Sequence, residues 1–276
     1  MHMTIGWYPG HMNKARKDII KLLQRVDLVI ELVDARLPYS SENPLLNSLI
    51  NETARLKILN KTDLADPVVT NLWLEFYKQK NITPYALDRT QPEAIKKLLK
   101  TARAVSGKKA DKVLRIMIVG IPNVGKSTFL NILLDRKVAK VGNEPAVTKS
   151  LSEINLGDSI KLIDTPGVLW PKIEDQQSAY RLAVTGAIKN TAIEFEDVAL
   201  FALDFLRKDY PEQLADRYQL LDTSLEASQL LEAIAKNRGC LRKGGVDYHK
   251  ASEVLLNDIR NGALGRVSLE KPELTL

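Results

Sequence analysis

The sequence predicts an α/β domain, with a mostly parallel sheet and helices on both of its faces, followed by a smaller all-α domain. Between residues 28 and 163, short β-branched apolar runs alternate with stretches of helical periodicity, which is typical of a parallel sheet. Beyond about residue 171 only helical periodicity is found, over 175–190, 194–210, 212–221, 224–237 and 247–261. We therefore expect one domain at residues 1–170 and a helical domain at residues 171–276.

The elements of the first domain follow from its apolar runs and from the residues that flank them. Strands are expected at residues 28–33, 56–59, 82–87 and 115–119, with a hairpin of residues 152–156 and 160–163 around Gly157-Asp158. Helices are expected at residues 12–26, 67–79, 92–107 and 126–134. Asp66-Pro67 offers a capping side chain and a proline at the first helical position, which marks the start of the second helix.

The composition is that of an ordinary globular protein. Of the 276 residues, 45% are hydrophobic and 27% are charged. No apolar stretch approaches the roughly 18 residues that cross a bilayer, and the first residues lack the apolar core of a signal peptide. The single cysteine, Cys240, cannot form an internal disulfide, which suits a reducing compartment. We expect a cytoplasmic monomer without a membrane partner.

Positive charge gathers in the first domain. The formal net charge is +6, yet residues 171–276 hold 14 Lys/Arg against 17 Asp/Glu, so the basic excess lies in residues 1–170. It concentrates between residues 14 and 25 and between residues 96 and 115. This distribution favours a polyanionic partner, although charge runs also occur on ordinary solvated faces. The tail holds one basic cluster that is a candidate RNA contact: Lys236, Arg238, Arg242 and Lys243.

A glycine-rich sequence between a predicted strand and a predicted helix carries the strongest chemical signal. Residues 120–127 read GIPNVGKS, which satisfies the phosphate-loop pattern G-x-x-x-x-G-K-[ST] in the strand–turn–helix context that it requires. Backbone N–H groups of such a loop surround phosphate oxygens, the lysine reaches the β- and γ-phosphates, and the serine hydroxyl binds Mg²⁺. We expect phosphate contacts from Asn123, Val124, Gly125, Lys126, Ser127 and Thr128.

A second sequence, Asp164-Thr165-Pro166-Gly167, follows the predicted strand at residues 160–163. A carboxylate at the end of this strand can hold Mg²⁺ through water, and the Gly167 N–H can approach the γ-phosphate. The D-x-x-G pattern is weak by itself, but it becomes specific downstream of a phosphate loop. We therefore expect Asp164 to serve the metal and Gly167 the phosphate.

A third sequence, Asn60-Lys61-Thr62-Asp63, stands ahead of the other two, at the end of the predicted strand at residues 56–59. A carboxylate at Asp63 can accept two hydrogen bonds from guanine N1–H and N2–H₂, which adenine does not offer. Adenine would leave that carboxylate unpaired, at a cost of several kcal/mol, which disfavours an ATP-using kinase. We expect Asn60, Lys61 and Asp63 to bind guanine.

Together these sequences resemble the TRAFAC-class GTPases, and their order resembles the circularly permuted members of that class. Two further stretches are similar to the ribosome biogenesis GTPase A (YlqF-type) family: residues 7–16, WYPGHMNKAR, and residues 33–40, VDARLPYS, with Asn43-Pro44. The resemblance covers most of residues 5–190. It implies a circularly permuted P-loop GTPase domain, Mg²⁺-dependent hydrolysis of GTP to GDP, and assistance to assembly of the large ribosomal subunit. Our hypothesis is that the protein acts there as a ribosome-stimulated molecular switch.

The resemblance also assigns roles to single residues. It implies that Thr148 binds Mg²⁺ in the GTP state, and that Asn123 helps to hold K⁺, a further candidate cofactor. The loop after the third predicted strand supports guanine in relatives. Here it reads Leu87-Asp88-Arg89-Thr90 and departs from the family pattern, so we expect Asp88 and Arg89 to contact the base mainly through the backbone.

Catalysis has no obvious residue in the usual place. Many GTPases orient the attacking water with a glutamine just after D-x-x-G, where this chain has Val168-Leu169. The resemblance nominates His11, whose neutral imidazole could accept a proton from water near neutral pH. The alternative is a histidine that caps the following helix. A second alternative concerns the whole protein: a nucleotide-gated module that recruits a basic ribosomal protein through its acidic tail, with little RNA contact.

Overall fold

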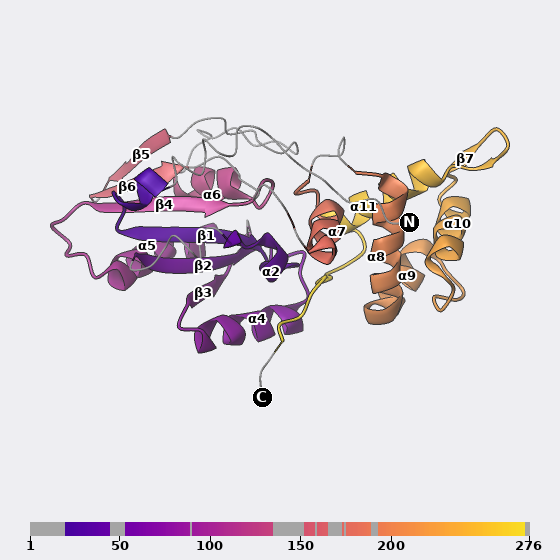
Figure 1. Ribbon diagram of the computed structural model, residues 1–276, viewed down its shortest axis with the longest axis horizontal. Helices are drawn as coiled ribbons and strands as arrows, with labels where there is room; N and C mark the ends of the chain where they lie inside the picture. The colour runs from indigo at the N-terminus through magenta and orange to yellow at the C-terminus, as the bar shows by residue number, and fades with distance from the viewer. Residues whose placement is uncertain are drawn as a thin grey trace.

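A computed structural model gives the fold, and it describes residues 20–44, 53–88, 90–134, 152–157, 159–164, 173, 175–188 and 193–273, with only the backbone for residues 152, 153 and 164. Figure 1 shows a sheet with covering helices and, beyond the carboxyl ends of its strands, a bundle of helices. This architecture confirms the predicted class, a mostly parallel α/β domain followed by a helical region. The predicted boundary near residue 170 lies outside the described residues.

Six strands form one sheet in the order β3-β2-β1-β4-β6-β5. All neighbouring pairs are parallel except β5 with β6, which form the predicted antiparallel hairpin. The strands are β1 (Leu28–Asp34), β2 (Ala54–Asn60), β3 (Thr83–Ala86), β4 (Leu114–Gly120), β5 (Ser152–Gly157) and β6 (Ile160–Asp164). The strand that enters the glycine-rich loop, β4, is therefore fourth along the chain but lies between β1 and β6 in the interior of the sheet.

Most of the described helices lie within a few residues of the predicted ones, but the short helix at residues 38–41 was not predicted, and the helix that begins at Gln176 ends at Val184, before the predicted end at residue 190. Around the sheet they are α2 (Pro38–Ser41), α4 (Pro67–Gln79), α5 (Pro92–Ser106) and α6 (Lys126–Leu133). The helical bundle contains α7 (Gln176–Val184), α8 (Phe195–Asp209), α9 (Pro211–Tyr218), α10 (Ala227–Asn237) and α11 (Tyr248–Asn261). The Asp66 carboxylate accepts hydrogen bonds from the N–H groups of Val68 and Val69, so it caps α4 as predicted. Of the helix expected at residues 12–26, only residues 20–23 are described as helical.

Both faces of the sheet are covered because both faces of its strands are apolar. On one face Ile30 and Ile116 belong to the same buried cluster as Ile95 of α5 and Phe129 of α6. On the other face Val33 and Leu59 pack with Trp73 and Tyr77 of α4. Further along this second face Leu22, Leu23 and Val26 pack against Val29, Met117 and Ile163. Burial on two faces explains why the strands read as continuous apolar runs.

A buried group of charged side chains interrupts this pattern. Glu31, in the middle of β1, is fully buried and lies beside Arg55, Lys57 and the N–H of Asn43. Burial by itself would raise the pKa of Glu31, but the positive charges of Lys57 and Arg55 outweigh it and lower that pKa. The Glu31 carboxylate is thus paired with cations and hydrogen-bonded inside the sheet. Removing one of its partners would leave a buried charge without compensation.

The helical bundle is built around α8, which packs against α7, α9, α10 and α11. The sequence predicted no strands in this region, and that expectation was wrong in one detail. A two-stranded hairpin of β7 (Leu241–Arg242) and β8 (Gly245–Val246) connects α10 to α11. Two residues per strand are too few to produce a periodicity, so the hairpin left no signal. Cys240, just before it, is buried and forms no disulfide.

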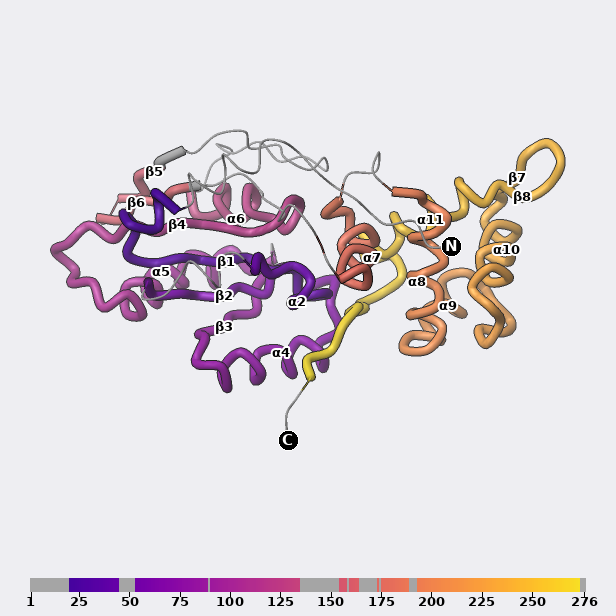
Figure 2. Tube along the Cα trace, viewed as in Figure 1, coloured from indigo at the N-terminus to yellow at the C-terminus, as the bar shows by residue number. Residues whose placement is uncertain are grey.

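The end of the described chain returns from the bundle to the sheet domain. Figure 2 shows the segment after α11 passing beside α2 and approaching α4. The Glu270 carboxylate accepts hydrogen bonds from the N–H (3.0 Å) and hydroxyl (2.6 Å) of Ser40, and its backbone carbonyl accepts one from Trp73 Nε1 (3.2 Å). Residues more than 190 positions apart are thereby joined. Within the described part of the chain, no helix is long and apolar enough to cross a membrane.

The Glu270 contact predicts a pH dependence of stability. Burial raises the pKa of Glu270, against the opposing effects of Ser40 and Arg181. Because this pKa is higher in the folded state, the group stabilises the fold fully below its ordinary value of 4.5, and this contribution is lost as the pH rises through the folded-state pKa. Glu270→Gln should therefore flatten the pH dependence of the unfolding free energy, measured by urea titrations from about pH 4.5 upward. The exposed Glu273→Gln should not, and equal profiles for Glu270→Gln and the wild type would contradict this prediction.

Candidate functional site

The three predicted nucleotide-binding sequences meet at one edge of the sheet. In the parallel register Asp34 of β1 lies beside Asn60 of β2, and Leu32 of β1 lies beside Gly120 of β4. On the other side of β4, Ile118 lies beside Asp164, the last residue of β6. Ligands of open parallel sheets bind in the crevice outside the carboxyl ends of the strands. Sequences that are 40 to 100 positions apart are thereby gathered at the position where such a ligand would bind.

The glycine-rich loop depends on two glycines because other chain segments approach it closely. A Cβ atom at Gly120 would lie 2.6 Å from the carbonyl oxygen of Leu32. A Cβ atom at Gly125 would lie 2.3 Å from Nδ2 of Asn60, and Gly125 also has φ of +103°. The Lys126 ammonium folds back over the loop and donates to the carbonyl oxygens of Gly120 (3.1 Å) and Ile121 (3.3 Å). The loop is therefore closed by its own lysine and fits tightly between β1 and the Asn60 side chain.

The first turn of α6 follows this loop directly. Gly125 is the N-cap residue and Lys126 begins the helix, so Ser127 and Thr128 stand in its first turn. Free N–H groups and the partial positive charge of a helix N-terminus favour phosphate at this position. The predicted phosphate contacts are thus gathered in one turn of the chain. Their roles in binding stay a prediction.

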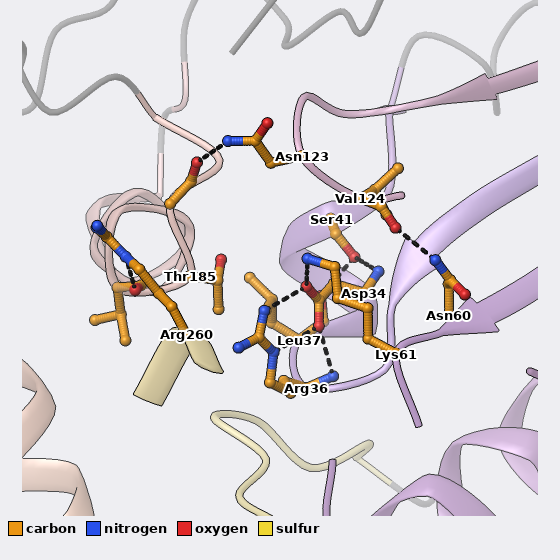
Figure 3. Close-up of polar contacts among 12 residues, drawn as sticks. Asp34, Arg36, Leu37, Ser41, Asn60, Lys61, Asn123, Val124, Thr185 and Arg260 are labelled. Atoms are coloured by element: carbon orange, nitrogen blue, oxygen red, sulfur yellow. Dashed lines mark hydrogen bonds and ion pairs between the residues drawn. The ribbon is translucent and has the colours of Figure 1, made fainter. Parts of the chain in front are cut away.

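A direct hydrogen bond joins the predicted guanine loop to the phosphate loop. Asn60 Nδ2 donates to the carbonyl oxygen of Val124 at 2.7 Å (Figure 3). The next residue, Lys61, has φ of +64°, in the left-handed region, so the chain turns sharply at this point. Asp63, two residues later, is half-buried. The position of the base-reading loop is therefore tied to that of the phosphate loop, as a single nucleotide would require.

Asp88, which follows β3, is hydrogen-bonded to the loop that contains Asp63. Its carboxylate accepts hydrogen bonds from the Thr62 hydroxyl (2.9 Å) and from the N–H of Thr90 (2.7 Å). Burial would raise the pKa of Asp88, but the hydrogen bonds from Thr90 and Thr62 lower it. The side chain thus points toward the loop that contains Asp63. The base contacts expected for Asp88 and Arg89 stay predictions, and Arg89 lies outside the described residues.

At the centre of the site lie residues for which the sequence predicted no role, among them Asp34 and Arg36. Asp34, at the end of β1, accepts from Nε (2.9 Å) and Nη2 (2.8 Å) of Arg36 and from the Lys61 ammonium (2.9 Å). Its N–H donates to the Ser41 hydroxyl oxygen at 2.9 Å. Burial would raise the pKa of Asp34, yet Arg36 and Lys61 hold it far below its ordinary value. Asp34 and Arg36 belong to the V-D-A-R sequence that resembles the family, but the resemblance by itself did not predict the contacts that these two residues make.

Arg36 extends this cluster into the helical bundle. Its guanidinium is 1% exposed, and Nη1 donates to the carbonyl oxygen of Ile259 in α11 at 3.2 Å. Nearby, Arg260 donates through Nε to the carbonyl oxygen of Val184 (2.9 Å) and through Nη2 to that of Ala183 (2.8 Å), at the end of α7. Burial, and secondarily the charge of Arg36, lower the pKa of Arg260 to about 10. Two arginines therefore connect the nucleotide edge with α7 and α11.

Asn123 in the phosphate loop makes a second link to the bundle. It has φ of +57°, and its Nδ2 donates to the carbonyl oxygen of Gly186 at 2.7 Å. Gly186 follows α7, so the phosphate loop is in direct contact with the first helix of the bundle. The K⁺ contact expected from the resemblance stays a prediction for this residue.

Several predicted site residues lie outside the described part of the chain: His11, Thr148 and Gly167. For Asp164 the backbone alone is described, at the end of β6. The basic residues of the tail differ in their surroundings. Lys236 forms an ion pair with Glu232 (2.7 Å), and Arg238 lies 3.6 Å from Asp258, whereas Arg242 and Lys243 are exposed at the β7–β8 hairpin. The predicted RNA contacts stay a prediction.

Comparison with known proteins decides the family. A family model described as 50S ribosome-binding GTPase matches residues 115–236. A ribosome biogenesis GTPase A of Priestia megaterium is 44% identical over 98% of this chain and 98% of its own length. The chain belongs to the ribosome biogenesis GTPase A family. Its relative in Thermotoga maritima, also named ribosome biogenesis GTPase A, is 34% identical over 98% of this chain and 95% of its own length.

Solved structures agree with this membership of the ribosome biogenesis GTPase A family. GDP-bound YlqF superposes with a TM-score of 0.69 at 28% identity, covering 93% of this chain and 100% of that one. GNP-bound YlqF from Thermotoga maritima gives a TM-score of 0.68 at 29% identity, with coverages of 94% and 99%. As a member of this family, the protein is a GTPase, an enzyme that hydrolyses GTP. P-loop GTPases generally use Mg²⁺ in this reaction.

The buried ion cluster predicts a large effect of Asp34→Asn on stability. Asparagine cannot accept the two-pronged contact from Arg36 as an anion, so the buried guanidinium of Arg36 and the half-buried ammonium of Lys61 lose their counter-charge. Breaking a buried pair in this way costs about 3–5 kcal/mol. Guanidinium unfolding should show this loss for Asp34→Asn and less than about 0.5 kcal/mol for Asp111→Asn, an exposed control. A loss below about 1 kcal/mol for Asp34→Asn would contradict a central role of the cluster.

Proposed function

We propose that this GTPase assists assembly of the large ribosomal subunit as a nucleotide-dependent switch. The relatives that span the chain are named ribosome biogenesis GTPase A, and the matching family model is described as 50S ribosome-binding. The observation that carries the nucleotide part is the Asn60–Val124 hydrogen bond, which joins a base-reading loop to a phosphate loop. In this proposal the GTP form docks on the subunit precursor, and hydrolysis releases the protein.

Recognition of the nucleotide divides between the two loops. The carboxylate of Asp63 accepts from guanine N1–H and N2–H₂, while Asn60 and Lys61 hold the base loop in position. The phosphates lie against the N-terminus of α6, with N–H groups of residues 123–128 and the Lys126 ammonium around them. Lys126 moves from the carbonyl oxygens of Gly120 and Ile121 to the β- and γ-phosphates. The Gly167 N–H completes the γ-phosphate contacts.

The residues at this edge fit a magnesium ion. Hydroxyl and carboxylate oxygens are hard ligands of the kind that Mg²⁺ prefers. Ser127 in the first turn of α6 and Asp164 at the end of β6 stand on elements adjacent to β4, with the Asp164 backbone beside Ile118. Ser127, Asp164 and Thr148 would hold the ion, which offsets charge on the phosphate oxygens when bound. Asn123 would contribute to a K⁺ site beside it.

Hydrolysis in this proposal uses His11 to orient the attacking water. Val168-Leu169 follow Asp164-Thr165-Pro166-Gly167, and an apolar side chain cannot accept a hydrogen bond from water. A neutral imidazole can accept one near pH 7. Docking on the ribosomal subunit would bring His11 to the γ-phosphate, which makes hydrolysis depend on the partner.

The role of His11 predicts a specific kinetic defect. Large ribosomal subunits should stimulate single-turnover GTP hydrolysis by the wild type, and His11→Ala should lower the stimulated rate by about 10²–10⁴-fold with unchanged GTP affinity. His249→Ala, an exposed histidine of α11, is the matched control, and ATP should not be hydrolysed. Equal stimulation of His11→Ala and the wild type would show that His11 is not needed for hydrolysis and has a structural role. Absence of stimulation in both would favour the protein-recruitment alternative.

Contact with ribosomal RNA is proposed for the basic face of the sheet domain. On α5 and the segment between it and β4, four cationic side chains are exposed: Lys97, Lys100, Lys109 and Lys112. The exposed hairpin residues Arg242 and Lys243 would add a contact from the bundle, with smaller contributions from Lys236 and Arg238. Phosphate contacts of this kind release counterions, so affinity falls steeply with salt.

The basic face predicts a change in the salt dependence of RNA binding. Lys97→Glu combined with Lys100→Glu should weaken filter binding to large-subunit RNA about tenfold and lower the slope of log K against log[salt] by roughly 1.4–1.8. Lys78→Glu, on α4 and outside this face, should change neither quantity. An unchanged slope in the double variant would contradict RNA contact by α5. Crosslinks to ribosomal proteins alone would favour the protein-recruitment alternative.

A further inference from the structure

The segment after α11 is hydrogen-bonded to the loop that follows the guanine-reading sequence. Arg266 donates through Nε to the carbonyl oxygen of Ala65 and through Nη2 to that of Thr62, both at 2.8 Å. The N–H of Val267 donates to the carbonyl oxygen of Leu64 at 3.0 Å. Three consecutive contacts of this segment therefore hold carbonyl groups on both sides of Asp63.

The packing around these bonds leaves little freedom for either segment. Gly262, which ends α11 with φ of +78°, lies against Leu64, and a Cβ atom there would come within 2.7 Å of Leu64 Cδ2. The Asp66 N–H donates to the Ser268 hydroxyl oxygen at 3.1 Å. The hydroxyl of Tyr210, the residue between α8 and α9, donates to the Asp66 carboxylate at 3.2 Å and accepts from the Ser268 N–H at 3.0 Å. The base loop is thus fastened to the bundle over its whole length.

Arg266 has a geometric role that another cation would not fill equally well. A guanidinium is a planar fork with several fixed donors, so it can hold two carbonyl groups at once, whereas an ammonium is a point charge on a flexible stem. The two carbonyl groups belong to Thr62 and Ala65, and Asp63 lies between them in the chain. Without the Arg266 guanidinium, the loop would keep the hydrogen bond from the Val267 N–H. It would lose the two bonds to the carbonyl groups on either side of Asp63.

We propose that Arg266 is a positioning residue for guanine recognition. It holds residues 62–65 so that the Asp63 carboxylate keeps both hydrogen bonds to the base. This inference rests on the proposed reading of guanine by Asp63. It makes nucleotide affinity depend on docking of the segment after α11, and because linkage is reciprocal, bound guanine nucleotide in turn stabilises that docking.

The test compares GDP with inosine diphosphate, which lacks the 2-amino group and so offers Asp63 one hydrogen bond fewer. Arg266→Ala should raise the Kd for GDP about tenfold, equivalent to about 1.4 kcal/mol, but the Kd for inosine diphosphate less than about threefold. The preference for GDP over inosine diphosphate should therefore shrink. Arg266→Lys should restore part of it, since one of the two carbonyl groups can still be held.

Two further variants separate the possible failures. Arg207→Ala is the matched control, because Arg207 also donates to backbone carbonyl groups, at Ser224 and Leu225, but within the bundle. It should leave the preference unchanged. Asp63→Ala should abolish the preference; if it does not, the proposed guanine reading is wrong. The positioning role of Arg266 is overturned if Asp63→Ala abolishes the preference for GDP but Arg266→Ala leaves it unchanged. This would be seen as equal weakening of GDP and inosine diphosphate binding, or as no weakening of either.

Discussion

The ion pairs of the buried Asp34 carboxylate are the interaction on which one edge of the sheet depends, the edge where the predicted nucleotide-binding sequences meet. The carboxylate neutralises two cations from different stretches of the chain, Arg36 and Lys61, at a position where neither could be buried alone. Lys61 belongs to the base loop, and Arg36 reaches the carbonyl oxygen of Ile259 in the bundle. One carboxylate at the end of β1 thus joins the sheet, the predicted guanine-binding sequence and the helical region. Its lowered pKa keeps it charged throughout the physiological range.

The second organising feature is close approach between loops. The Asn60 side chain lies so near Gly125 that any larger residue there would collide with it, and the same side chain holds the carbonyl group of Val124. The base loop and the phosphate loop are therefore in direct contact, so that a movement of one would displace the other. The phosphate loop is also bonded to the bundle through Asn123 and Gly186. A displacement of α7 would consequently be transmitted to the phosphate loop without passing through the sheet.

These contacts give the permuted order of motifs a physical consequence. In this chain residues 164–167, which are predicted to contact the γ-phosphate, precede the helices of the bundle, and no described strand of the six-stranded sheet follows them in the sequence. The bundle is already fastened to the base loop through residues 266–268 and to the phosphate loop through Gly186. The proposed switch therefore needs no separate relay, because any change at the γ-phosphate would act on a bundle that both nucleotide loops contact.

Local patterns in the sequence determined the strands, most helix boundaries and the phosphate and guanine motifs, because periodicity, capping and turn chemistry involve only neighbouring residues. Asp66 capping α4 and the hairpin of β5 with β6 are examples. The roles of all the predicted site residues stay predictions from motif and resemblance, and His11, Arg89, Thr148 and Gly167 also lie outside the described residues. The tertiary structure alone decided the contacts of Asp34, Arg36 and Arg266, since some of their partners lie more than 200 positions away, up to 223 for Arg36 and Ile259. A buried charge is defined by what surrounds it, and that is set when distant segments pack together.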